Sequence, residues 1–334
     1  MRRKSRKEPS HRLHPFQQLT GISNRSYSLR IQKFITDFGA EHSFERSVKK
    51  MQEHHPLASI PVSSARQIVQ RHAAKACKHL PGVLSDHEFS KQMIIEMDGE
   101  MIPTVHFKPG LDKRKNRITA WEELRIGVVQ NQGESEWKYA CSFKSADQLG
   151  IRLEQTMRGL GFTEETKVHS VGDGALWIIE QGERIAGPNF SHIIDIFHLC
   201  EYFSAAYEGL RLEPKKEMFS LKLKMEEGHI EEVLRQLKKE QEIALYHEGL
   251  EACIRYIANR PGQFNYATAK AQGLPVGSGK VESTHRSLIQ RRLKIPGAWW
   301  LRENADTMAN LRTLRANGGW ELLWNKNSSS LYNF

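Results

Sequence analysis

Paired cysteines, long apolar runs and an excess of acidic charge are absent from this sequence. Its cysteines number four and lie far apart, so they indicate neither a disulfide framework nor a zinc ribbon, and a reducing, cytoplasmic setting fits. No apolar run of about eighteen residues is present, as a membrane-spanning helix would need. The basic start MRRKSRKEPSHRLH also lacks the apolar stretch of a signal peptide. The sequence therefore predicts a soluble protein with no membrane partner.

Positive charge is in excess. The 334 residues include 49 Lys and Arg against 39 Asp and Glu, which gives a net charge of +10. A balance of this sign favours a polyanionic partner such as nucleic acid. Residues 1–27 are expected to form a basic flexible arm able to touch phosphates, with a purely solubilising tail as the alternative.

The stretch LPVGSGKVEST, residues 274–284, looks like a phosphate-binding glycine loop, but its spacing excludes that function. A Walker-type loop needs a glycine five places before Gly279, where Leu274 stands, and a hydroxyl after Lys280, where Val281 stands. What remains is a tight turn that starts a helix with Glu282 in its first turn.

Residues 28–85 show helical spacing of apolar residues. In IPVSSARQIVQRHAAKA, a serine can cap a helix whose outer face is polar and basic. The layout is that of a helix-turn-helix DNA reader, and a plain helical bundle is the alternative. The candidate DNA-contacting side chains of this helix are Arg66, Gln67, Gln70 and Arg71.

From residue 91 onward the pattern changes to strands. Strand-like runs at 91–99, 124–133 and 136–145 precede a helix at about 146–160. A strand (166–174), a helix around ALWIIEQGERI and a last strand (190–199) follow. This order predicts an α/β fold with a mixed sheet whose parallel part is covered by helices. Residues 200–273 are helical and charged, and this pattern indicates an insertion before the GSG turn.

Three carboxylates stand at informative places. Asp98 is expected to end the first strand and Asp173 the later one, each directly before a glycine. If these strands are parallel neighbours, the two carboxylates meet at one sheet edge, and Glu282 can complete the group. Such a group would be repulsive without cations, so it predicts Mg²⁺ or Mn²⁺, as two ions that catalyse phosphoryl transfer. Taken singly, each residue has a purely structural alternative. An Asp-Gly pair at the end of a strand commonly forms a turn, and a glutamate in the first turn of a helix commonly interacts with the helix dipole.

Two further sets of residues are candidates near this site. Asp195 and His198 form a DxxH pattern, and His198 is a structural histidine, a partner of a metal ligand or a DNA contact. The helix after the GSG turn carries side chains suited to phosphates near a scissile bond, with an ordinary solvated basic face as the alternative. These side chains are His285, Arg286, Arg291, Arg292 and Lys294.

The combination of these motifs with the long run GLPVGSGKVESTHRSLIQRRLKIPGAWW resembles bacterial insertion-sequence transposases of the DDE class, most closely the ISKra-type group. The resemblance covers roughly residues 28–325. It implies an RNase H-like catalytic core (91–199 and 274–325), interrupted by the helical insertion, with Asp98, Asp173 and Glu282 as metal-binding catalytic residues. It also implies an N-terminal helix-turn-helix for the terminal inverted repeats, hydrolysis at the element's ends and attack of the freed 3′-hydroxyl on target DNA.

The sequence departs from the resemblance in two respects. Family members often carry more N-terminal sequence, sometimes with cysteine pairs, so a truncated copy is one interpretation of this chain. Lys270 occupies a position where an arginine is expected. A lysine keeps the positive charge, but it cannot make the bidentate hydrogen bonds that an arginine makes to phosphate.

Three functional hypotheses follow. The first is an active transposase, nucleoid-associated in the cytoplasm, acting as a dimer or larger assembly on DNA because transposition joins two ends. The second is a catalytically inactive, truncated remnant that only binds DNA. The third is a structure-specific nuclease on the same core, whose activity would not depend on Arg66 and Arg71.

Overall fold

The computed structural model describes residues 27–82, 88–110, 116–210, 213–244 and 246–325. These residues fall into two compact units, one comprising the described residues 27–72 with 324–325 and the other the described residues of 73–323. The basic arm predicted for residues 1–27 lies, apart from Tyr27, outside the described residues, as do 83–85 of the predicted reader region. Within the described ranges, no helix has the length and apolar character needed to cross a membrane.

The first unit contains three helices, α2 (Leu29–Glu41), α3 (Phe44–His54) and α4 (Val62–Ala76), the last of which runs on past the unit boundary. Serine hydroxyls cap the first two: Ser28 accepts from Ile31 N–H and Ser43 accepts from Arg46 N–H. The helices enclose a small apolar core. Its buried members are Ile35, Val48, Met51, Ile60, Ala65 and Ile68.

Close contact between α2 and α4 depends on Gly39. A Cβ at this position would lie 2.5 Å from Cγ2 of Val69. The missing side chain therefore lets the two helices pack closely.

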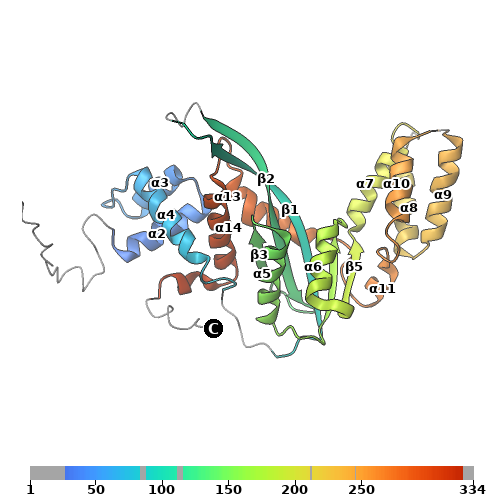
Figure 1. Ribbon diagram of the computed structural model, residues 1–334, viewed down its shortest axis with the longest axis horizontal. Helices are drawn as coiled ribbons and strands as arrows, with labels where there is room; N and C mark the ends of the chain where they lie inside the picture. Colours follow the sequence, from blue (N-terminus) through green and yellow to red (C-terminus); the bar gives the residue numbers. More distant parts are fainter. Residues whose placement is uncertain (1–26, 83–87, 111–115, 211–212, 245, 326–334) are drawn as a thin grey trace, which may run out of the picture. The chain divides into compact units, whose positions relative to one another are not determined.

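The second unit is built on a five-stranded sheet with the order β3-β2-β1-β4-β5. The first three strands, β1 (Gln92–Phe107), β2 (Arg117–Asn131) and β3 (Lys138–Ser142), pair antiparallel. The last two, β4 (Lys167–Gly172) and β5 (Phe190–Ile194), run parallel to β1. The central strand β1 thus separates the antiparallel half from the parallel half (Figure 1).

The two faces of β1 have different neighbours, because successive side chains of a strand point to opposite faces. Met93, Ile95 and Met97 pack under α5 (Ala146–Arg158) and α6 (Leu176–Ala186) in one apolar core. The other face begins with Ile94, which joins a second core together with α7 (Ile196–Tyr207), and then turns acidic.

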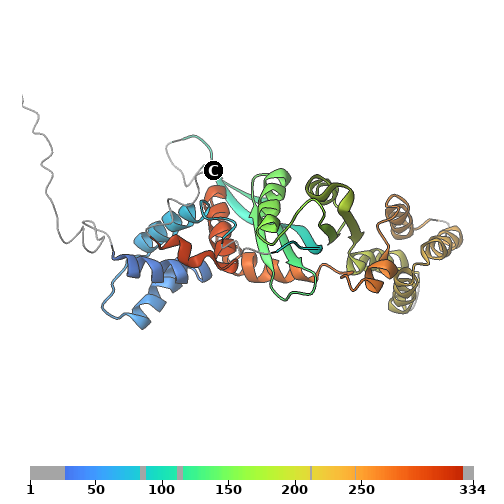
Figure 2. The same ribbon diagram turned by 90° about the horizontal axis from the view of Figure 1, so that it is seen from below.

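A block of helices follows β5 in the chain. It consists of α7, α8 (Pro214–Glu226), α9 (Ile230–Ile243), α10 (Glu248–Ala258) and α11 (Tyr266–Ala271). Their apolar stripes meet in the second core, with Phe203, Leu237, Leu250 and Cys253 among its buried residues. Figures 1 and 2 show α8, α9 and α10 side by side beyond the β5 edge of the sheet.

The chain then returns to the sheet. The helix α12 (Gly279–Thr284) runs into a π-helical turn (His285–Gln290) and α13 (Arg291–Leu293), and α14 (Arg302–Ala316) follows. Two short 3₁₀ turns complete the unit, one before β5 at Gly187–Asn189 and one after α14 at Gly319–Leu323.

The predicted order of three strands, helix, strand, helix and strand is confirmed, and with it the α/β fold class of an RNase H-like mixed sheet with flanking helices. The predicted division into arm, reader, core and insertion stays a prediction.

Candidate active site

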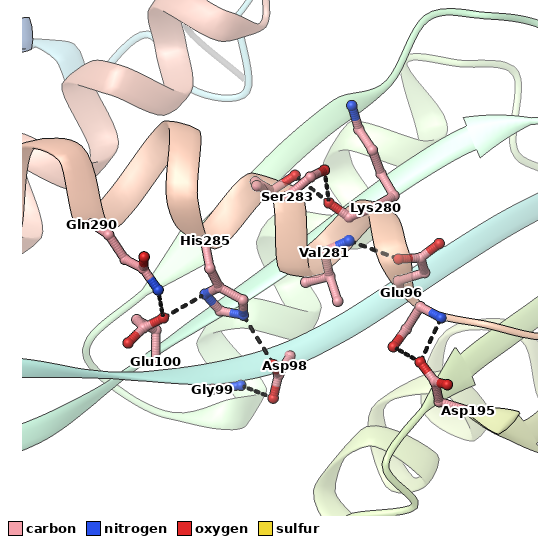
Figure 3. A network of polar contacts seen from close by, with 12 residues as sticks. Glu96, Asp98, Gly99, Glu100, Asp195, Lys280, Val281, Ser283, His285 and Gln290 are labelled. Carbon is pink, nitrogen blue, oxygen red and sulfur yellow. Dashed lines mark hydrogen bonds and ion pairs between the residues drawn. The ribbon is translucent and has the colours of Figure 1, made fainter. Parts of the chain in front are cut away.

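The acidic face of β1 carries three carboxylates on alternate residues, Glu96, Asp98 and Glu100. Alternate residues of a strand share a face, so these side chains form a row along the strand. Figure 3 shows the row facing the helical segment 279–294. The site is therefore the contact between one strand and one helical segment that are far apart in the sequence.

Each carboxylate of the row contacts that segment, and His285 lies between two of them, because its Nδ1 is 3.5 Å from Glu100 Oε2. Val281 N–H donates to Glu96 Oε2 at 2.7 Å. His285 Nε2 lies 3.1 Å from Asp98 Oδ2. Glu100 accepts from Gln290 Nε2 at 2.8 Å (Figure 3). Glu100 also forms an ion pair with Lys294. The row fixes the helical segment along the strand by polar contacts.

Glu96 was not singled out by the sequence analysis. The residue is 2% exposed, and burial raises its pKa to about 7, with the nearby Asp195 adding to the rise and the N–H groups of Val281 and Lys280 opposing it. Its position two residues before Asp98 on a strand was the available signal, because it predicts a shared face.

Asp98 lies in the middle of β1, so the prediction that it ends the first strand is wrong. The strand continues to Phe107 because β2 pairs with it along its whole length. The Asp98 side chain is 40% exposed, and its Oδ1 accepts from Gly99 N–H at 2.6 Å. Gly99, which was expected to mark a turn, lies within β1.

Asp173 directly follows β4, as predicted. Its side chain is exposed, and its Oδ1 accepts from Ala175 N–H at 2.9 Å. In the parallel pair, Glu96 lies opposite Val171. This is the last pair of the two strands, so Asp98 and Asp173 each come two residues after it, at the boundary between the two halves of the sheet.

Glu282 lies in the first turn of α12, as predicted, with an exposed side chain. It stands three residues before His285, which contacts Asp98. No hydrogen bond or ion pair ties the Glu282 carboxylate to another described residue. It is therefore free to change rotamer.

The described residues include no group of three or more His, Cys, Asp or Glu side chains arranged to hold a metal ion. Carboxylate oxygens are the ligands that Mg²⁺ prefers. The donor set thus fits Mg²⁺ in kind, while Asp98, Asp173 and Glu282 are not gathered into one ligand set.

Asp195 acts as a clamp. Its Oδ1 accepts from Phe197 N–H at 2.6 Å, which caps α7, and its Oδ2 accepts from Ser278 N–H at 2.7 Å and from the Ser278 hydroxyl. The predicted strand 190–199 is therefore too long: it ends at Ile194, because Asp195 is a good N-cap and starts a helix.

His198 is half-buried in an aromatic cluster. Its Nδ1 lies 3.3 Å from Glu201 Oε2, and its ring meets those of Tyr202 and Tyr256 edge-on at 5.5 and 5.9 Å. These contacts include neither Asp98 nor Asp173, so its role as a metal-ligand partner or DNA contact stays a prediction.

The positive stripe predicted for the helix after the GSG turn is only partly exposed. His285 is 5% exposed. Arg292 is 2% exposed, with its guanidinium 4.8 Å from the Trp300 ring centroid, and Lys294 pairs with Glu100. These three do not form an exposed DNA surface. Their side chains instead contact Asp98, Trp300 and Glu100, partners that the local helical spacing does not predict.

Arg286 and Arg291 are exposed. Neither forms an ion pair within the described part of the chain, so both can reach a phosphate. Lys270, in contrast, lies 3.1 Å from Glu226 Oε1, and its charge is compensated inside the helical block.

The predicted reader helix α4 exposes Arg66 and Gln67, while Gln70 is half-buried. Arg71 is exposed but donates to Gln32 Oε1 at 2.7 Å. Gln32 also bonds to buried His72, so Arg71 has a structural role beside any contact with DNA.

No protein-family model matches the chain, and no curated protein matches it. Among solved structures, the chain is similar to one described as "Drosophila P element transposase strand transfer complex". The TM-score is 0.35 at 10% identity, over 94% of this chain and 84% of that chain. A similarity this low assigns neither a fold nor a function.

Proposed function

We propose that the chain is a DDE-class DNA transposase of the ISKra-type group, which cuts at the ends of an insertion sequence and joins the freed 3′-hydroxyl to target DNA. One observation supports the proposal. The β1–β4 pairing ends at Glu96 and Val171, two residues before Asp98 and Asp173, and the helical segment that bears Glu282 is bound to the face of β1 that carries Asp98.

Asp98, Asp173 and Glu282 would hold Mg²⁺ or Mn²⁺, as two ions. Bound ions of this kind activate a water or a 3′-hydroxyl and stabilise the departing oxygen. Because the Glu282 carboxylate is exposed and unpaired among the described residues, a rotamer change is the motion by which it would join the two aspartates. His285 holds Asp98 through Nε2.

The DNA partner is bound by exposed cations in both units. Arg286 and Arg291 lie on the segment that carries Glu282, where they suit phosphates near the scissile bond. Arg66 and Gln67 on α4 suit base edges of the terminal inverted repeats. A dimer or larger assembly on DNA follows from the chemistry, since transposition joins two ends.

Cleavage of labelled DNA that carries the element's ends tests this function. With Mg²⁺ or Mn²⁺, the wild-type chain should nick at those ends. Asp98→Ala, Asp173→Ala and Glu282→Ala should each lower cutting by about a hundredfold or more while DNA binding is kept, because each removes a metal-binding oxygen. Glu303→Ala, which removes an exposed glutamate of α14, is the matched control and should cut like the wild type.

A second candidate function is DNA binding without chemistry, as in an inactive transposase remnant or a regulator. The observation in its favour is that no metal-binding group of three or more side chains is assembled among the described residues. Specific binding of the element's ends by a wild-type chain that never cuts them with either metal would establish this second function and exclude the first.

A further inference from the structure

Arg260 lies next to Gly174, the residue that follows Asp173, although the two are far apart in the sequence. Gly174, the residue after Asp173, has a positive φ of 77°, and a Cβ built on it would lie 3.1 Å from Arg260 Nε and still closer to Ile194. Only a residue without a side chain permits this approach. Ile194 N–H also donates to Gln263 O at 2.8 Å, which fixes the segment of Arg260 beside the end of β5.

The guanidinium of Arg260 is held in place by a buried tyrosine. Its Cζ lies 3.9 Å from the ring centroid of Tyr256, and its Nη1 donates to Tyr256 O at 3.1 Å. Tyr256 is 6% exposed and stacks on Tyr202 with ring centroids 4.0 Å apart. Its hydroxyl donates to Asp173 O at 2.8 Å. One stack thus joins Arg260 to the backbone of Asp173.

Arg260 has no acidic partner within the described part of the chain. Its Nε and Nη2 donate to no acceptor among the described residues. Neither nitrogen is buried without a hydrogen-bond partner, so both remain accessible to solvent. Lysines of the same unit differ in this respect: Lys222 and Lys270 both pair with Glu226. A preorganised guanidinium with free N–H groups matches the geometry of a phosphate.

We propose that Arg260 binds a phosphate of the DNA strand that lies at Asp173. This inference rests on the proposed function, because it takes DNA as the substrate of the site. The stack on Tyr256 lowers the conformational entropy that the side chain loses on binding. The helical block thereby contributes a DNA contact to the catalytic edge of the sheet.

The test compares Arg260→Gln, Arg260→Lys and a matched control, Arg255→Gln, all in the full-length chain. Arg255 lies on α10, shortly before Arg260, is exposed and pairs with Glu251. Binding of a labelled duplex carrying the element's end is measured over a range of NaCl concentrations, alongside Mg²⁺-dependent cutting. Thermal unfolding checks that each variant is folded.

We expect Arg260→Gln to weaken binding about tenfold and to lower the slope of log Kd against log [NaCl] by about one, the effect of one lost phosphate contact. Arg260→Lys should keep the slope and lower the cutting rate, because it keeps the charge and loses the fork. Arg255→Gln should resemble the wild type.

A folded Arg260→Gln with wild-type slope and affinity overturns the inference and leaves the proposed function standing. If Arg260→Gln does not fold, wild-type cutting by Arg260→Lys overturns it instead. If the wild-type chain binds the duplex without cutting it, the proposed catalytic function is wrong. The difference in the slope of log Kd against log [NaCl] between the wild type and Arg260→Gln then still tests whether Arg260 binds a phosphate. A wild-type chain that binds no DNA overturns both.

Discussion

Glu96 and His192 are ionisable side chains buried at the sheet, and burial favours the neutral form of each. The pKa of Glu96 is raised to about 7. The pKa of His192 on β5 is lowered to about 4, first by burial and then by the neighbouring His169. His192 Nδ1 lies 3.1 Å from the Ser170 hydroxyl, while its Nε2 has no hydrogen-bond partner among the described residues. In the protonated ring, Nδ1–H can donate to the Ser170 hydroxyl, but Nε2–H has no acceptor among the described residues.

At the residue scale, His192 should make folding stability fall at acidic pH. Its pKa is lower in the folded chain than its usual 6.5, so the unfolded chain takes up a proton that the folded chain does not. The stabilisation is present above about pH 6.5 and is lost as the pH falls toward 4. Between pH 7 and 4.5 we expect the wild type to lose roughly 2 to 3 kcal/mol more unfolding free energy than His192→Gln.

Urea unfolding at the two pH values measures this difference. His229→Gln, which replaces an exposed histidine of the same unit, should keep the wild-type pH dependence. Equal losses in the wild type and in His192→Gln would contradict the assignment.

At the element scale, the turn before α12 is held by side chains from the sheet. Asp195 binds Ser278, and Glu96 binds Val281 N–H, so two buried carboxylates hold the segment that leads to Glu282. The helix itself is short, and its π-helical turn departs from regular geometry. Its position therefore depends on these tertiary contacts more than on helix propensity.

Asp195→Asn should loosen this turn. The asparagine keeps one oxygen for the cap of α7, but its amide nitrogen cannot accept from Ser278 N–H or from the Ser278 hydroxyl. We expect a loss of about 1 to 3 kcal/mol of unfolding free energy, measured by urea unfolding at neutral pH. Ser283→Ala removes an exposed hydroxyl that donates to Lys280 O and should stay within about 0.5 kcal/mol of the wild type. Wild-type stability of Asp195→Asn would show that the clamp is dispensable.

At the scale of the whole molecule, the chain divides into two compact units, and the proposed roles divide with them. The α4 side chains that suit base readout belong to the first unit, and the carboxylates belong to the second. Arg71 is unsuited to a clean test because it also bonds to Gln32. Arg66 and Gln67 are exposed and have no such contact among the described residues.

The double variant Arg66→Ala/Gln67→Ala should weaken binding of the element's ends about tenfold or more, because it removes base-contacting side chains. Metal-dependent cutting of unrelated DNA should persist. Competition binding with end and unrelated duplexes measures the effect, with Lys49→Ala, an exposed lysine of α3, as the control. Unchanged end recognition and cutting would favour the structure-specific nuclease over the transposase.

The strand and helix order was predictable because each element has a local pattern. Alternating and continuous apolar runs indicated β1 to β5, and helical stripes indicated α5 and α6. The ends of elements were less predictable. Asp98 lies in mid-strand because β2 extends the pairing, and β5 stops early because Asp195 caps α7. Both outcomes depend on a neighbour that the local sequence does not contain.

Local periodicity and turn chemistry were enough to predict the α/β class, the order of the five strands along the chain and the position of Glu282 at the start of a helix. Three further facts required the folded chain: the helical segment 279–294 contacts the carboxylates of β1, Arg292 is buried, and Arg260 lies beside Gly174. Each depends on which distant segments meet, and long-range packing sets that.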